Sequence, residues 1–135
     1  MTWETWWAGA EMGDVTYYGI QKLESEGLIP LIEAIYEPLW SPEKLAAYAL
    51  QAVVTACLAN SALLAFRCDR DFTTPIWTAA HQKAWDLGEP DGPTMYVSSV
   101  GVWTRSFEHG RVVMNPTAKP FGNCAAHSAQ IVLDR

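Results

Sequence analysis

The chain has 135 residues, a formal net charge of −6 and a sequence pI of about 4.9, and half of its residues are hydrophobic. These values are typical of one globular domain with a single core, and they exclude a disordered chain. An acidic surface repels phosphate groups, so we expect neither nucleic acid nor an anionic membrane surface as a partner. No apolar stretch reaches the roughly 20 residues that span a bilayer, so a soluble protein is expected.

The N-terminal residues and the cysteines do not indicate a secreted protein. Residues 1–4 carry no basic region ahead of an apolar core, so no secretory signal is expected, and the compartment stays open. The number of cysteines is odd and no CxxC spacing occurs, which favours small buried thiols over a disulfide framework or a zinc site. These cysteines are Cys57, Cys68 and Cys124.

The first elements in chain order are a helix and an apolar strand. Helical spacing of apolar residues predicts a helix over residues 15–26, with Gly27 as its C-terminal cap. A nearly continuous apolar run over residues 28–36 then predicts a strand of a parallel sheet that is covered on both faces. Pro30 is expected near the start of this strand, because proline cannot donate a hydrogen bond to a neighbouring strand.

A second helix and a second strand follow. Ser41 is expected to cap this helix, with Pro42 as its first residue, and the apolar pattern continues to Leu58. The apolar run over residues 62–66 predicts a strand that lies beside the first strand and parallel to it, as in a βα unit with a right-handed crossover.

The next signals predict one more helix. Thr74 and Pro75 are typical of a helix start, and Gly88 and Pro90 are typical of its end. Residues 28–87 therefore have the order strand, helix, strand, helix, which favours a parallel α/β sheet.

After a loop at residues 89–94 the pattern changes to antiparallel β structure. Strands are expected over residues 102–107 and 111–114, and Glu108, His109 and Gly110 are expected to form a three-residue loop between them. Gly110 would then occupy the left-handed position of the loop. Asn115-Pro116 is expected to end the second strand, and residues 131–133 are expected to form a last short strand.

Charged residues follow both predicted parallel strands, at the edge of the sheet where barrel enzymes place their catalytic groups. Glycoside hydrolysis needs two carboxyl groups, one as acid and one as base or nucleophile. Glu37 and Asp69 are the candidate catalytic pair, and Arg67 is a candidate for holding a substrate hydroxyl or tuning a carboxylate. The alternative is that these charges are simply solvated strand ends.

Tryptophan is abundant, with seven residues in the chain. Trp40 and Trp77 follow the two strand ends, on the side where a substrate would lie, and flat indole rings suit the apolar faces of sugars. Both are therefore candidate substrate-binding residues, with core packing as the alternative. His81 lies in the last predicted helix, where a surface role is expected.

Motifs of other enzyme classes are missing from the sequence. It contains no HExxH, no Walker loop, no GxGxxG and no GxSxG. We therefore expect no metal and no cofactor.

One segment resembles a known family. Residues 105–116 fit the pattern R-x-F-x-x-G-x-V-x-x-N-P, with Arg105, Phe107, Gly110 and Val112 followed by Asn115-Pro116. This pattern is similar to the closing hairpin of glycoside-hydrolase-like barrel proteins, and residues 85–90 are similar to the linker that precedes it there. The resemblance implies a (β/α)₈ enzyme that acts on carbohydrate. In the hairpin itself no group must be catalytic, so its residues are expected to have a structural role.

A whole (β/α)₈ barrel takes about 250 residues. We therefore expect an α/β fold that is a partial TIM-type (β/α) barrel, in which the last βα units precede a C-terminal antiparallel β-hairpin. Residues 1–135 would form a single domain, with βα units over 1–90 and the hairpin and tail over 91–135. The expected function is that of the C-terminal part of a glycoside hydrolase, inactive alone and prone to self-association through an open sheet edge. The alternatives are a non-catalytic carbohydrate-binding or scaffold module, and a small complete α/β domain.

Overall fold

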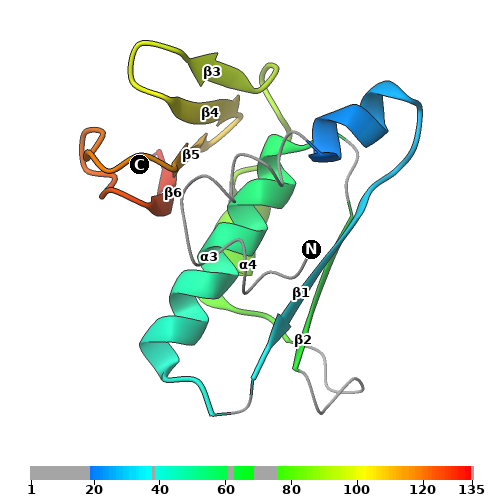
Figure 1. The fold of residues 1–135 in the computed structure, drawn as a ribbon, viewed down its shortest axis with the longest axis vertical. Coiled ribbons are helices and arrows are strands. Elements are labelled where there is room, and N and C mark those ends of the chain that lie inside the picture. The colour runs from blue at the N-terminus through cyan, green and yellow to red at the C-terminus, as the bar shows by residue number, and fades with distance from the viewer. Residues whose placement is uncertain (1–18, 38, 61–62, 69–75, 135) are drawn as a thin grey trace.

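The computed structural model describes residues 19–37, 39–60, 63–68 and 76–134. Helices and strands alternate in its first half, and only strands follow in its second half (Figure 1). The elements are β1 (Leu31–Tyr36), α3 (Pro42–Leu58), β2 (Leu63–Cys68), α4 (Ala79–Asp86), β3 (Met95–Val97), β4 (Val102–Phe107), β5 (Gly110–Asn115) and β6 (Ser128–Leu133).

The helix before β1 ends at the predicted glycine. Residues 19–25 are helical, and Gly27 has a left-handed φ of 79°. The backbone N–H of Leu28 donates to the carbonyl of Leu23, and that of Gly27 donates to the carbonyl of Glu24. These two bonds form a Schellman motif, which confirms the predicted cap. The predicted start of this helix lies outside the described residues.

The two apolar runs form adjacent parallel strands, as predicted. β1 pairs with β2 in parallel, from Leu31 opposite Leu63 to Tyr36 opposite Cys68. The connecting helix α3 starts where the cap signal placed it, because the Ser41 side chain accepts a hydrogen bond from the Lys44 backbone at 3.1 Å.

The start of α4 differs from the prediction. Residues 76–78 are not helical, and the N-cap of α4 is Thr78, whereas the predicted start signal at Thr74 and Pro75 lies outside the described residues. The Thr78 hydroxyl accepts from the backbone of His81, while the His81 ring accepts from the Thr78 backbone N–H. This reciprocal capping box fixes the helix start at Ala79. The predicted stop is confirmed, because Gly88 directly follows the C-cap residue with a left-handed φ of 74°.

The second half of the chain forms a four-stranded antiparallel sheet in the order β3-β4-β5-β6. The predicted hairpin is present as β4 and β5, but its loop has two residues, because Phe107 pairs directly with Gly110. Gly110 has a positive φ of 156°, in the range that favours glycine, but it is the first residue of β5 and does not take the left-handed helical position of a three-residue loop. The last strand, β6, is longer than predicted and pairs with the whole of β5.

Helix α3 lies between the two sheets (Figure 1). Its buried side chains, such as Tyr48 and Leu58, belong to one core with Ala34 of β1, Val112 of β5 and Ile131 of β6. The fold is therefore mixed helix and strand, with a parallel βαβ unit and an antiparallel sheet packed on the same helix. This arrangement is compatible with the predicted α/β class, but it does not show a partial TIM-type barrel, because among the described residues only β1 and β2 pair in parallel and the other strands form a separate antiparallel sheet.

Candidate functional site

The carboxyl ends of β1 and β2 lie side by side, since Tyr36 and Cys68 are paired at the last position of the two strands. Glu37 directly follows β1 and is exposed to solvent. Asp69, the other predicted carboxylate, lies outside the described residues. The backbone of Arg67 pairs with that of Ile35, while the Arg67 side chain is outside the described part of the chain.

A continuous set of ring contacts joins the two predicted sugar-binding tryptophans. The Trp40 ring meets Tyr48 edge-on at 4.9 Å between centroids, and Tyr48 lies 6.0 Å from Phe66. Phe66 is 5.3 Å from His81, and His81 is 5.3 Å from Trp77. We call these five residues the aromatic cluster. It extends from the carboxyl end of β1 across β2 to the first turn of α4, so residues far apart in the sequence meet beside the predicted site.

The two tryptophans differ in what they offer to a ligand. Trp40 is half-buried, and the Lys44 ammonium lies over its ring, 4.3 Å from the centroid. Trp77 is 61% exposed, and its indole N–H donates to the Gln82 side chain at 3.1 Å. The second arrangement leaves much of a positioned indole ring accessible, as stacking against a sugar requires. Trp77 therefore offers more of its ring to a ligand than Trp40 does.

His81 does not have the surface role predicted for it alone, because its ring is partly buried and helps to cap α4. Its Nδ1 accepts from the Thr78 backbone N–H at 3.1 Å and lies 2.8 Å from the Thr78 hydroxyl, so the proton of the neutral ring resides on Nε2. Burial against Phe66 and Trp77 lowers the pKa of His81, since burial disfavours the charged imidazolium. The spacing of Thr78 and His81, three residues apart at a helix start, is the signal that could have predicted this contact.

A buried hydroxyl fastens the cluster to the sheet. Tyr48 is fully buried in α3, and its hydroxyl accepts from the backbone N–H of Ile35 in β1 at 3.1 Å. The position of α3, and with it the Trp40 loop that precedes it, is thus fixed relative to the strand end that carries Glu37.

The residues of the hairpin pattern have structural roles. Arg105 is buried, and its guanidinium donates to the carbonyls of Cys57 and Ala59, at 3.1 and 2.8 Å, and to that of Gly92 at 3.0 Å. The first two are carbonyls at the end of α3, where the helix dipole favours a cation. Arg105 therefore attaches the antiparallel sheet to the central helix.

Asn115 has a comparable role at the other end of the pattern. Its side chain is 1% exposed; the amide donates to the carbonyls of Lys119 and Ala125, and the oxygen accepts from the backbone and hydroxyl of Thr117. Each hydrogen-bonding position of the amide is used in folding the loop that follows β5.

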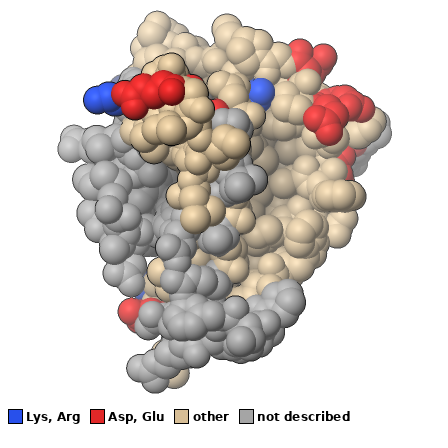
Figure 2. Space-filling view, turned by 90° about the vertical axis from the view of Figure 1, so that its right-hand side faces the viewer, with Lys and Arg blue, Asp and Glu red and all other residues tan. Residues whose placement is uncertain are grey.

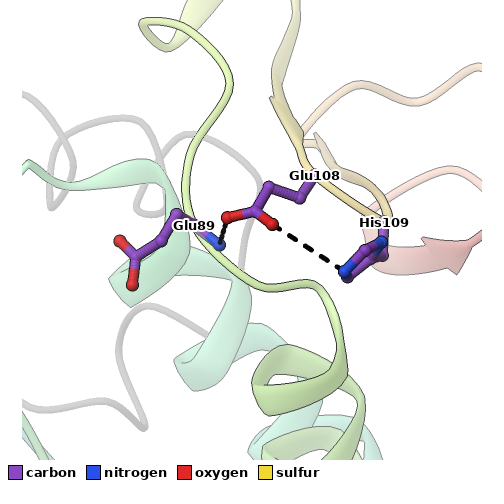
Figure 3. A network of polar contacts seen from close by, with 3 residues as sticks. All are labelled: Glu89, Glu108 and His109. Atoms are coloured by element: carbon purple, nitrogen blue, oxygen red, sulfur yellow. Dashed lines mark hydrogen bonds and ion pairs between the residues drawn. The ribbon is translucent and has the colours of Figure 1, made fainter.

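The hairpin turn is attached to the segment after α4 (Figure 3). The Glu108 carboxylate accepts from the Glu89 backbone at 3.1 Å, and its other oxygen lies 3.8 Å from His109 Nε2. Backbone bonds add to this, because Glu108 donates to the Glu89 carbonyl and His109 to that of Leu87. The carboxylate of Glu108 thus positions a turn, and nothing in this contact points to chemistry on a substrate.

The described ranges contain neither a metal-binding cluster nor a membrane-spanning helix. No group of three or more His, Cys, Asp or Glu residues in them could hold a metal ion, and no helix in them is long and apolar enough to cross a membrane. Comparison of the chain with protein-family profiles and with curated proteins finds no match.

Proposed function

We propose that the chain is the C-terminal part of a glycoside-hydrolase-like barrel, which contacts carbohydrate at the carboxyl ends of β1 and β2. The observation that carries the proposal is the exposed, positioned ring of Trp77 in a cluster that reaches the same end of the parallel strands as Glu37. The parallel βαβ unit also fits the order expected of the last units of such a barrel. The structural roles of Arg105 and Asn115 agree with a closing hairpin.

Hydrolysis by the isolated chain is not expected. The two carboxyl groups of a glycosidase are held about 5 to 5.5 Å apart for retention and about 6.5 to 9.5 Å apart for inversion. Glu37 is exposed, whereas the general acid of glycoside hydrolysis needs apolar surroundings. Contact with a sugar needs less, since an exposed indole ring is sufficient for weak stacking.

The second candidate function is a carbohydrate-binding module without catalysis. The same exposed Trp77 ring favours it, and the two candidates differ only in whether Glu37 and Asp69 act on a bound sugar when earlier barrel strands complete the site.

The test measures turnover of a panel of aryl glycosides together with sugar binding. We expect no turnover above the blank, and a shift of the Trp77 indole N–H signal in NMR spectra on addition of neutral oligosaccharides. Trp77→Ala should remove binding, while Trp85→Ala is the matched control, because Trp85 is 75% exposed on α4 but lies outside the aromatic cluster. Turnover that is lost in Glu37→Gln but kept in Glu43→Gln, which changes an exposed carboxylate in the first turn of α3, would instead show a complete enzyme.

We also propose that the isolated chain self-associates through β1. Exposed apolar side chains lie at and near its two ends, including Ile29, Leu31 and Leu39. Figure 2 shows the side of the molecule on which β1 and β2 lie; charged side chains gather mainly at its top, and the described part of its centre is uncharged. A second copy could cover these exposed apolar side chains. Sedimentation velocity should show dimers that Leu31→Lys disperses, and a monomer at every protein concentration would contradict this.

A further inference from the structure

The outer face of the antiparallel sheet carries a groove that the proposed site does not use. Side chains alternate between the two faces of a strand, so Val112 and Ile131 point into the core beneath α3. Arg111 and Val113 of β5 therefore point outward, as do the β6 residues that neighbour them in the sheet. These outward residues line a groove with a volume of about 390 Å³.

The loop after β5 forms one wall of the groove. Phe121 and Cys124 pair through their backbones at 2.8 and 2.9 Å, and both side chains pack with Val102 and Val113 in a second small core. This packing covers part of the outer face and leaves the remainder open beside the loop. The groove is lined by Arg111, Val113, Phe121, Gly122, Asn123, Gln130 and Val132.

Three polar side chains in this lining are available to a ligand. Within the described part of the chain, the side chains of Arg111, Asn123 and Gln130 form no hydrogen bond or ion pair. Asp134 follows β6 on the same face of the strand, but no ion pair joins it to Arg111 among the described residues. A guanidinium and two carboxamides thus surround an apolar surface of one phenyl ring and two valines, the composition expected of a small-molecule site.

The identity of these groups indicates the class of ligand. A guanidinium binds a carboxylate through two parallel hydrogen bonds. Carboxamides donate to and accept from hydroxyl groups, and a phenyl ring contacts the apolar face of a pyranose. The chain has a net charge of −6, so long-range attraction does not favour an anion, and Arg111 must supply the affinity at short range.

We propose that this groove binds a saccharide unit that carries a carboxylate, a hexuronate. The inference rests on the proposed function only for the expectation that the protein contacts carbohydrate. Arg111 binds the carboxylate, Asn123 and Gln130 bind ring hydroxyls, and Phe121 lies against the apolar face of the sugar. The groove is on the sheet face that points away from α3, so it is separate from the aromatic cluster.

The test uses methyl glucuronide, methyl glucoside and acetate as probes, with binding measured by NMR titration of the whole chain. The glucuronide should shift the backbone amide signals of Gly122 and Asn123, and it should bind about tenfold more tightly than either the glucoside or acetate, because each lacks one part of the recognised ligand. Arg111→Gln should weaken glucuronide binding about tenfold. Lys119→Gln removes the same charge from an exposed loop residue outside the groove, and it should leave binding unchanged.

Three outcomes would overturn the inference: equal binding of glucuronide and glucoside, glucuronide shifts confined to residues outside the groove, or unchanged binding in Arg111→Gln. Arg111→Lys keeps the charge and tests the geometry without threatening the fold, and it should still weaken binding several-fold. Trp77→Ala separates the two proposals. If Trp77→Ala still binds glucuronide and the native chain binds no neutral sugar, the groove proposal stands. Only the proposed site at the strand ends is then contradicted.

Discussion

Replacement of Gly110 by alanine is expected to destabilise the protein strongly, because a close approach of neighbouring atoms adds to the backbone strain at its φ of 156°. A Cβ atom at this position would overlap the carbonyl oxygen of Val132, which belongs to the neighbouring strand β6. It would also lie 2.9 Å from Leu87 Cδ2 and 3.0 Å from the Cα of Leu133. Two of these three neighbours are backbone atoms, so the added methyl group can fit only if β5 and β6 separate.

The expected loss in the free energy of unfolding follows from the displacement of β6 that the added methyl group requires. Forcing an extra methyl group into a packed site costs about 1 to 3 kcal/mol. Displacement of β6 would also disturb the hydrogen bonds next to Gly110, each of which contributes about 1 kcal/mol. We therefore expect Gly110→Ala to lower the free energy of unfolding by about 2 to 4 kcal/mol, and Gly110→Val by at least as much.

Urea denaturation of matched glycine variants tests this reasoning. Gly27→Ala places a side chain at a left-handed φ of 79° with nothing within 4 Å, so it should cost only about 1 to 2 kcal/mol from backbone strain. At Gly92 the φ is outside the left-handed region and nothing lies within 4 Å of an added Cβ. Gly92→Ala should therefore be neutral or stabilise the protein by up to about 1 kcal/mol. If Gly110→Ala cost no more than Gly27→Ala, the close approach of β6 would not be the reason for the glycine.

Three further predictions concern buried polar groups. Arg105→Met should lower the free energy of unfolding by about 2 to 4 kcal/mol, because it leaves carbonyls at the end of α3 without donors; an unchanged urea midpoint would contradict this. Asn115→Ala should cost about 2 to 3 kcal/mol and make the loop at 116–127 more sensitive to proteolysis, whereas an unchanged cleavage rate would show that the loop is held by other contacts. The lowered pKa of His81 means that the unfolded chain binds its proton more readily, so His81 contributes stability above about pH 6.5 that is lost as the pH falls toward the folded-state pKa. Urea midpoints at pH 7.5 and 5 should therefore differ less in His81→Gln than in the native chain, and an equal difference would refute the assignment.

Local signals with a direct physical cause predicted the first half of the fold. The Ser41-Pro42 cap, the Gly27 stop and the two apolar runs each depend on neighbouring residues alone, and the structure confirms them. The start of α4 was predicted wrongly because Thr74 is followed by proline, which favours a helix start, whereas Thr78 is followed by alanine. The contact of the His81 ring with the Thr78 backbone decides between them.

Features that depend on distant residues could not be predicted in the same way. The need for glycine at position 110 was predicted from its positive φ, but the close contacts with β6 and Leu87, which are far away in the sequence, were not. The buried partners of Arg105 likewise come from the end of α3, more than 40 residues earlier. The position of α3 between the two sheets follows from such contacts. It could not be predicted from the sequence pattern of any single helix or strand.

The candidate site was predicted only in part, because its local contacts depend on how individual side chains are oriented. The register of β1 and β2 brings the carboxyl ends of the two strands together, which a parallel sheet requires whatever the side chains are. The contacts that distinguish Trp77 from Trp40 depend on Gln82 and Lys44, and neither was singled out by the sequence pattern.

The most direct test of the proposed function follows the Trp77 indole N–H signal while neutral oligosaccharides are added to the purified chain, with aryl-glycoside turnover recorded on the same sample. We expect a saturable shift of this signal, its loss in Trp77→Ala but not in Trp85→Ala, and no turnover above the blank. Robust turnover that is abolished by Glu37→Gln or Asp69→Asn would contradict the claim that the chain is inactive alone, and the lack of any shift with every sugar would contradict carbohydrate contact at the strand ends.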